Sequence, residues 1–114
     1  MNGLAFKTPS LGIAVGGDYA APTASADVAA VSDFSAPWSA AGRQPSGYRS
    51  GVSFVPGTLF TAIAVGLTGS DVSYDAGHHW TTFDTASYDT VSCAKDGACW
   101  ASGDLGQVAV LHGL

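Results

Sequence analysis

The chain has 114 residues, 46% of them hydrophobic, and a net charge of −5 with only four basic residues. This length allows one domain with a modest core, and so few cations disfavour nucleic-acid binding, which needs a basic surface. The longest apolar run, "FTAIAVGL" at 60–67, is far shorter than the ~20 residues of a membrane-spanning helix, so no membrane span is expected. The opening "MNGLAFKTPS" lacks the basic start and apolar block of a secretory signal.

The composition favours strands over helices. All nine acidic residues are Asp, Glu is absent, and 15 residues are Gly. Asp and Gly suit tight turns, whereas Glu and Lys are helix formers. We therefore expect an all-β, turn-rich chain with essentially no long helix.

Short apolar segments separated by Gly, Pro and Asp follow one another in three groups. The expected strands cover 3–8, 11–16, 27–32 and 37–41, then 50–55, 60–66, 70–74 and 79–84, then 89–94, 98–103 and 106–111. A repeat of ~40 to 45 residues with four antiparallel strands is typical of a β-propeller blade. Residues 1–114 are thus predicted to form a partial propeller, with blades at 3–41 and 49–84 and a third at 88–111 that lacks its outer strand.

One motif repeats between the third and fourth strands of the first two groups. The segment "SYDAGHHW" places Ser73, Asp75, Gly77 and Trp80 at fixed spacing, and 42 residues earlier "VSDFSAPW" places Val31, Asp33, Ser35 and Trp38 at the same positions. Two of the four residues are kept. His78 and His79 fill the variable positions; as neighbours at a strand start they face opposite ways, so no metal site is expected from them.

The spacing Ser-x-Asp-x-Gly-x-x-Trp resembles the Asp-box, or bacterial neuraminidase repeat, and the chain from about Leu4 to Leu111 resembles Asp-box propellers similar to photosystem II stability and assembly factors. The resemblance implies that Asp75 binds backbone amides in a hairpin turn, that Gly77 has a positive φ and that Trp80 packs between blades. The copy at 31 departs from the pattern at Val31 and Ser35, which implies a looser turn. The family favours an extracytoplasmic location without deciding it.

Two full blades and three further strands cannot close a ring of 4 to 8 blades. Exposed sheet edges invite pairing with another chain, and a repeat needs neighbours to bury its faces. The partner predicted is therefore either a second copy of the chain, giving a homo-oligomer, or the remainder of a longer propeller chain. Two copies, each with nearly three blades, would approximate a six-bladed ring.

Cys93 and Cys99 flank the segment "AKDGA". A turn there makes the two cysteines cross-strand neighbours in one register and places them on opposite faces in the register one residue away. Two separate buried thiols are the favoured reading, with a disulfide as the alternative. No metal site is expected, because the pair lacks further ligands, and no cofactor is implied.

In a propeller the loops opposite the Asp-box turns form the usual ligand face. The candidate ligand residues predicted on that face are Asp18, Tyr19, Tyr48, Arg49, Asp71 and Asp104. Arg49 is singled out because a guanidinium at a channel mouth can bind a carboxylate. The alternative, which is favoured, is an ion pair of Arg49 with Asp71 or Asp18.

Two functions are compatible with these features. The first is a non-catalytic scaffold that binds a protein or small ligand through the loop face. The second is a sialidase-like glycan-binding or glycoside hydrolase propeller, which needs an arginine triad, a Tyr and Glu pair and an acid Asp. The chain has two Arg and no Glu, so one copy cannot supply that set. No complete hydrolase triad is visible either, and the scaffold is the function predicted, with no enzyme activity.

Overall fold

The computed structural model describes residues 2–18, 20–21, 23–25, 28–33, 37–103 and 106–111. These residues form strands and turns with no α-helix. The strands are β1 (Gly3–Thr8), β2 (Leu11–Val15), β3 (Ala29–Asp33), β4 (Ser39–Ala40), β5 (Gly51–Phe54), β6 (Ala62–Gly66), β7 (Gly69–Ser73), β8 (Thr81–Asp84), β9 (Thr90–Cys93), β10 (Cys99–Ser102) and β11 (Val108–Leu111). In this part of the chain, no helix is long and apolar enough to cross a membrane.

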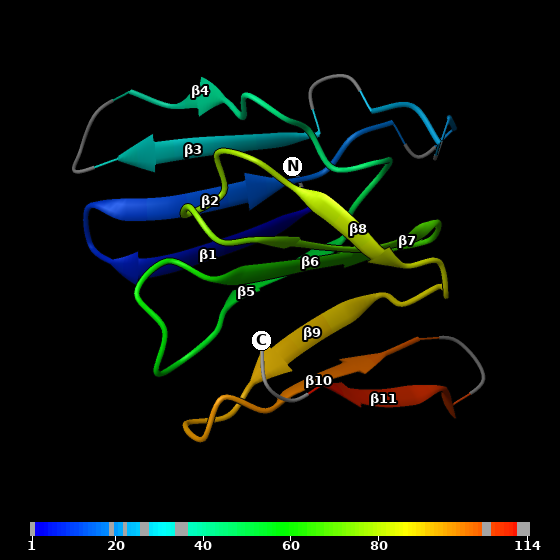
Figure 1. Ribbon diagram of the computed structural model, residues 1–114. Coiled ribbons are helices and arrows are strands. Elements are labelled where there is room, and N and C mark those ends of the chain that lie inside the picture. Colours follow the sequence, from blue (N-terminus) through cyan, green and yellow to red (C-terminus); the bar gives the residue numbers. More distant parts are fainter. Residues whose placement is uncertain are drawn as a thin grey trace.

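The strands form three antiparallel sheets in which neighbours in sequence are neighbours in space. The first sheet has the order β1-β2-β3-β4, the second β5-β6-β7-β8, and the third β9-β10-β11. The sheets follow one another from the blue and cyan strands through the green and yellow strands to the orange and red strands (Figure 1). The predicted all-β class and the predicted grouping of strands are confirmed; no sheet closes on itself in the described residues.

The three sheets share one register between their first two strands. Phe6 pairs with Gly12 in the first sheet, Phe54 with Ala62 in the second and Cys93 with Cys99 in the third. The next pairs on the same face are Leu4 with Ala14, Val52 with Ala64 and Val91 with Ala101. The three sheets therefore repeat the strand order, and equivalent residues lie on the same face of each sheet.

The first strands of successive sheets lie beside one another, β1 against β5 and β5 against β9. Glycine permits this approach. A Cβ on Gly3 would lie 3.2 Å from the Cα of Gly51, and a Cβ on Gly51 would lie 3.1 Å from the Cα of Thr90. The Ser50 hydroxyl also donates to the Asp89 carbonyl at 2.6 Å, which ties the start of β5 to the start of β9.

Two hydrophobic cores separate the sheets, and β6 contributes to both. Its residues alternate, so that Ala62 and Ala64 pack with the first sheet whereas Ile63 and Val65 pack with the third. The period of two places successive side chains on opposite faces of a strand, and every residue of β6 is buried. The inner strands β6 and β7 of the middle sheet are thus buried throughout, whereas its outer strand β8 is mostly exposed.

We name the two faces of each sheet by their neighbours. The leading face faces the preceding sheet along the chain, and the trailing face faces the following sheet. On the second strand of the first two sheets the leading face carries small residues and the trailing face larger ones: Gly12 and Ala14 against Ile13 and Val15, then Ala62 and Ala64 against Ile63 and Val65. In the third sheet Cys99 and Ala101 lie on the leading face, and Trp100 and Ser102 lie on the trailing face.

Candidate functional site

Arg49, the residue singled out from the sequence, lies inside the protein with 0% of its side chain exposed. It follows a connection, residues 41–48, that runs from the first sheet to the second. Its Nη2 donates to Asp71 Oδ1 at 2.8 Å and to the Ser46 hydroxyl at 2.7 Å. Its Nη1 donates to the Tyr48 carbonyl at 2.9 Å and to the Thr68 hydroxyl at 3.1 Å. Among the described residues its buried Nε has no hydrogen-bond partner.

Asp71, on β7, is 1% exposed and completes a clamp around the connection. Its Oδ2 accepts from the Ser46 backbone amide at 2.9 Å, and its Oδ1 accepts from the Thr82 hydroxyl at 3.1 Å. The pair therefore holds the connection against β7 and β8. Arg49 has the ion-pair role weighed in the sequence, and its guanidinium has no solvent-exposed route to a ligand.

Of the other candidate ligand residues, Tyr48 adjoins this pair through its backbone carbonyl, and Asp18 makes its hydrogen bond elsewhere. Tyr48 is 5% exposed, so its ring is part of the interior. Asp18 is exposed, and its Oδ1 accepts from the Ala20 amide at 2.9 Å within its own loop. Tyr19 and Asp104 lie outside the described residues. Two of the six predicted residues, Arg49 and Asp71, thus form a buried ion pair, and the ligand face itself stays a prediction.

The turn between β7 and β8 is held by its own side chains. The Ser73 hydroxyl donates to Asp75 Oδ1 at 2.8 Å and accepts from the Gly77 amide at 2.9 Å. Asp75 Oδ1 also accepts from the His79 amide at 2.9 Å, and Oδ2 lies 2.6 Å from His79 Nδ1. Burial opposes ionisation of Asp75, but the hydrogen bonds from His79 and Ser73 prevail and lower its pKa below the usual value.

Gly77 and Trp80 connect this turn to the first sheet. Gly77 has φ of 93°, and a Cβ there would lie 2.9 Å from side-chain atoms of Ile13 and Val31. Trp80 is 2% exposed in the core between the first two sheets, and its Nε1 donates to the Gly77 carbonyl at 2.8 Å. The turn therefore positions the Trp80 ring between the first two sheets. Ala76, with φ of 60°, completes the tight reversal.

The earlier copy of the motif differs from the expected alignment. Gly12 pairs with Ser32, and the equivalent Ala62 pairs with Ser73, so Ser32 stands in the place of Ser73 and Val31 does not. Trp38 still matches Trp80, because each directly precedes the outer strand of its sheet. The first turn is consequently one residue shorter than the second, and its Ser35 lies outside the described residues.

The two histidines bind different carboxylates. His78 Nε2 lies 2.6 Å from Asp33 Oδ2 and so links the turn to the first sheet, whereas His79 pairs with Asp75 inside the turn. A cavity of about 260 Å³ lies here, lined by Leu11, Asp33, Phe60, Asp75, Ala76 and His78. This lining supplies no serine, threonine or cysteine as a nucleophile. Within the described part of the chain, no group of three or more His, Cys, Asp or Glu could hold a metal ion.

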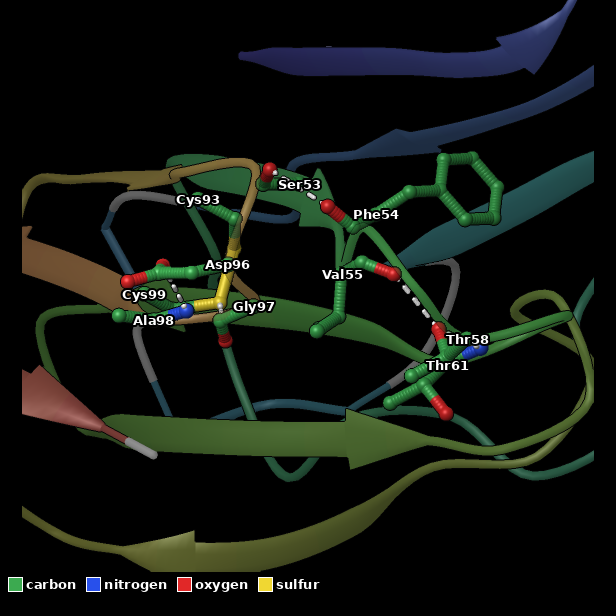
Figure 2. The surroundings of a disulfide bond; sticks show 10 residues. All are labelled: Ser53, Phe54, Val55, Thr58, Thr61, Cys93, Asp96, Gly97, Ala98 and Cys99. Atoms are coloured by element: carbon green, nitrogen blue, oxygen red, sulfur yellow. Dashed lines mark hydrogen bonds between the residues drawn. A yellow bond between two sulfur atoms is a disulfide. The ribbon is translucent and has the colours of Figure 1, made fainter. Parts of the chain in front are cut away.

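Cys93 and Cys99 form a disulfide, not the two separate thiols favoured from the sequence. They are directly opposite across β9 and β10, with Cα atoms 4.0 Å apart. The turn that sets this register has Gly97 at φ of 88° and an Asp96 carboxylate that accepts from the Ala98 amide at 3.0 Å. Figure 2 shows the bond beside Val55, which belongs to the same core as Cys99.

The disulfide takes a place that phenylalanine has in the other sheets. The equivalent pairs are Phe6 with Gly12 and Phe54 with Ala62. In the first sheet the ring lies directly over the glycine, because a Cβ on Gly12 would lie 2.4 Å from a Phe6 ring carbon. A covalent bond in the third sheet thus replaces an aromatic ring packed on a small residue.

Sequence reasoning did not single out the two outermost faces of the stack. The leading face of the first sheet exposes Leu4, Phe6 and Trp38, and the trailing face of the third exposes Trp100, Val108 and Val110. The alternation of small and large residues in the second strands of the first two sheets was the signal that could have found them. A shallow cavity of about 350 Å³ lies on the first of these faces, lined by Leu4, Ala14, Ala30 and Trp38.

Comparison of the chain with protein-family models, curated proteins and solved structures finds no match.

Proposed function

We propose that the chain is a non-catalytic β-propeller scaffold whose ring is completed by further sheets, supplied by self-association or by a longer chain. The observation that carries this proposal is the common register of the three sheets, with first strands side by side and small leading faces packed on larger trailing faces. Sheets that repeat in this way continue until their end faces are covered.

The turn at residues 73–80 supports the Asp-box component of the proposal. Its Ser, Asp and Gly residues form the turn, and its Trp enters the space between two sheets. Each of these residues is occupied in maintaining the fold. The binding function is accordingly assigned to a surface that the completed ring presents, with a protein or small molecule as the ligand.

The glycosidase alternative lacks support at the level of residues. Glu is absent from the chain, and the buried guanidinium of Arg49 is bonded to Asp71, to the Ser46 and Thr68 hydroxyls and to the Tyr48 carbonyl. A retaining sialidase needs accessible arginines and a carboxylate beside its nucleophile. The disulfide supports placing the scaffold in an oxidising compartment, since such bonds persist there.

Light scattering coupled to size exclusion, combined with small-angle X-ray scattering, tests the proposal on the purified chain. A discrete assembly with the scattering profile of a disc around a central channel would support a completed ring. An assembly whose profile fits a linear stack of sheets would contradict it. A fluorogenic sialoside should be hydrolysed no faster than by buffer, and turnover would instead favour the glycosidase.

A further inference from the structure

We propose that a second copy of the chain covers the two end faces head to tail: the trailing face of the third sheet in one copy packs on the leading face of the first sheet in the other. This inference rests on the proposed scaffold function and names its partner and contact surface. It concerns the exposed residues Leu4, Phe6 and Trp38 at one end and Trp100, Val108 and Val110 at the other.

The two contacts between neighbouring sheets inside the chain show which residues pack against a leading face and which against a trailing face. Between the first two sheets, Ile13 and Val15 pack on the face of Val52, Ala62 and Ala64. Between the second and third sheets, Ile63 and Val65 pack on the face of Val91, Cys99 and Ala101. A leading face therefore accepts large residues from the second strand of the preceding sheet.

The free leading face has the same construction. Leu4 and Ala14 stand where Val52 and Ala64 stand in the second sheet. Trp38 precedes β4 as Trp80 precedes β8, yet it is 47% exposed. Its ring and the Phe6 ring form a T-shaped pair with centroids 6.2 Å apart. The cavity of about 350 Å³ beside Trp38 lies where a preceding sheet would insert its large residues.

The free trailing face carries a large residue at the first of the two matching positions of its second strand, whereas Ser102 stands at the second, where the other sheets have Val15 and Val65. Trp100 takes the place of Ile13 and Ile63 on the second strand, and Val110 pairs with it on β11. Thr90 differs, since it stands where Gly3 and Gly51 allow close approach. The first strands of two copies are consequently further apart than those within one copy, and the indole of Trp100 fills the wider gap.

The area favours closure by two contacts over a single one. The smaller face limits the contact: the third sheet has three strands of four residues each. Because strands lie about 4.8 Å apart and rise about 3.3 Å per residue, its flat face is roughly 190 Å². One such contact is well below the roughly 800 Å² per partner of a stable complex. Two copies joined head to tail bury both end faces of each copy, which doubles the buried area and leaves no end free.

The test uses one variant for each face. Leu4→Lys places a charge on the leading face and Trp100→Glu places one on the trailing face; both side chains are more than half exposed in the single chain, so the fold tolerates the change. Analytical ultracentrifugation should find the wild type as a dimer. Each variant alone should be a monomer, with a dissociation constant raised by roughly 30-fold or more, the effect of losing a hot-spot residue.

Mixing the two variants decides the polarity. Together they retain one unaltered contact, and the introduced lysine and glutamate face each other at the second contact, so a one-to-one heterodimer should form. A contact between identical faces predicts the reverse: one variant would remain a dimer and the mixture would gain nothing. Leu59→Lys, at a 76% exposed residue outside both faces, is the matched control and should stay dimeric.

The outcomes also separate this inference from the proposed scaffold. A wild-type monomer at every concentration would overturn the inference and leave the end faces to sheets of a longer chain. A discrete ring unaffected by Leu4→Lys and Trp100→Glu would keep the scaffold and overturn the face pairing. The wild type could instead form assemblies larger than a dimer while the Leu4→Lys and Trp100→Glu variants still associate only with each other. That result would support the face pairing and overturn the closed ring.

Discussion

Trp38 and Trp80 precede the outer strands of successive sheets, but Trp80 is 2% exposed and Trp38 is 47% exposed. The difference follows from their surroundings. Trp80 packs in the core between the first two sheets, and its Nε1 donates a hydrogen bond to the Gly77 carbonyl. Trp38 instead lies on an end face beside Phe6. The same residue in the same repeat position is therefore a core residue in one sheet and a surface residue in the other.

Replacing these two residues should have unequal effects on folding. Trp80→Ala should lower the free energy of unfolding by about 3–5 kcal/mol, because it removes a large buried side chain. Trp38→Ala should cost about 1 kcal/mol or less, since its surface is already half in water. Urea denaturation of both changes in the monomeric Leu4→Lys background measures the single chain alone. Equal costs would contradict the placement of Trp80 between the sheets.

The Arg49–Asp71 pair should show strong coupling. Arg49→Met leaves the Asp71 carboxylate buried without its cation and should cost about 3–5 kcal/mol, and Asp71→Leu should cost a similar amount. The double variant should lose much less than the sum, because no charge is then left unpaired. A double-mutant cycle by urea denaturation checks this, with exposed Lys95→Met as a control within about 0.5 kcal/mol of wild type. Additive costs would contradict the clamp.

The strand plan was predictable because local patterns determine it. Short apolar runs ended by Gly or Asp mark segments such as β6, and the predicted ranges differ from the observed strands by only a few residues at their ends. The burial of Arg49 was not predictable in the same way. It depends on how the connection at 41–48 passes over β7, which is a long-range arrangement that spacing along the chain does not encode.

The first motif copy shows a second limit of sequence comparison. A constant offset of 42 residues aligns Trp38 with Trp80, but it also aligns Val31 with Ser73. Pairing across the sheets makes Ser32 the counterpart of Ser73, because one residue is missing from the first turn. A deletion inside a turn leaves both flanking strands intact, so only the hydrogen-bonded register reveals where it falls.

Asp75 should contribute a pH-dependent part of the stability. Its pKa is lower in the folded protein than the usual value, so its stabilising effect is fully present above the unfolded pKa of about 3.9 and is lost as the pH falls through the lower folded pKa. Asp75→Asn should remove this pH-dependent contribution, so that stability falls less steeply below about pH 4 in the variant than in the wild type. Thermal unfolding of both proteins from pH 6 to pH 2.5 measures it. Parallel curves would contradict the assignment.

The disulfide should stabilise the third sheet by closing a short loop. Its cysteines are separated by 6 in sequence, and the chain-entropy relation gives about 2 kcal/mol for a loop of that size. Cys93→Ala combined with Cys99→Ala should lose about that amount in urea denaturation, because the constraint on the unfolded chain disappears. Reduction of the wild type should produce a similar loss and should leave the double variant unchanged, which separates the bond from general effects of the reductant. Two reactive thiols in the oxidised wild type, with no response to reductant, would show that the bond does not form.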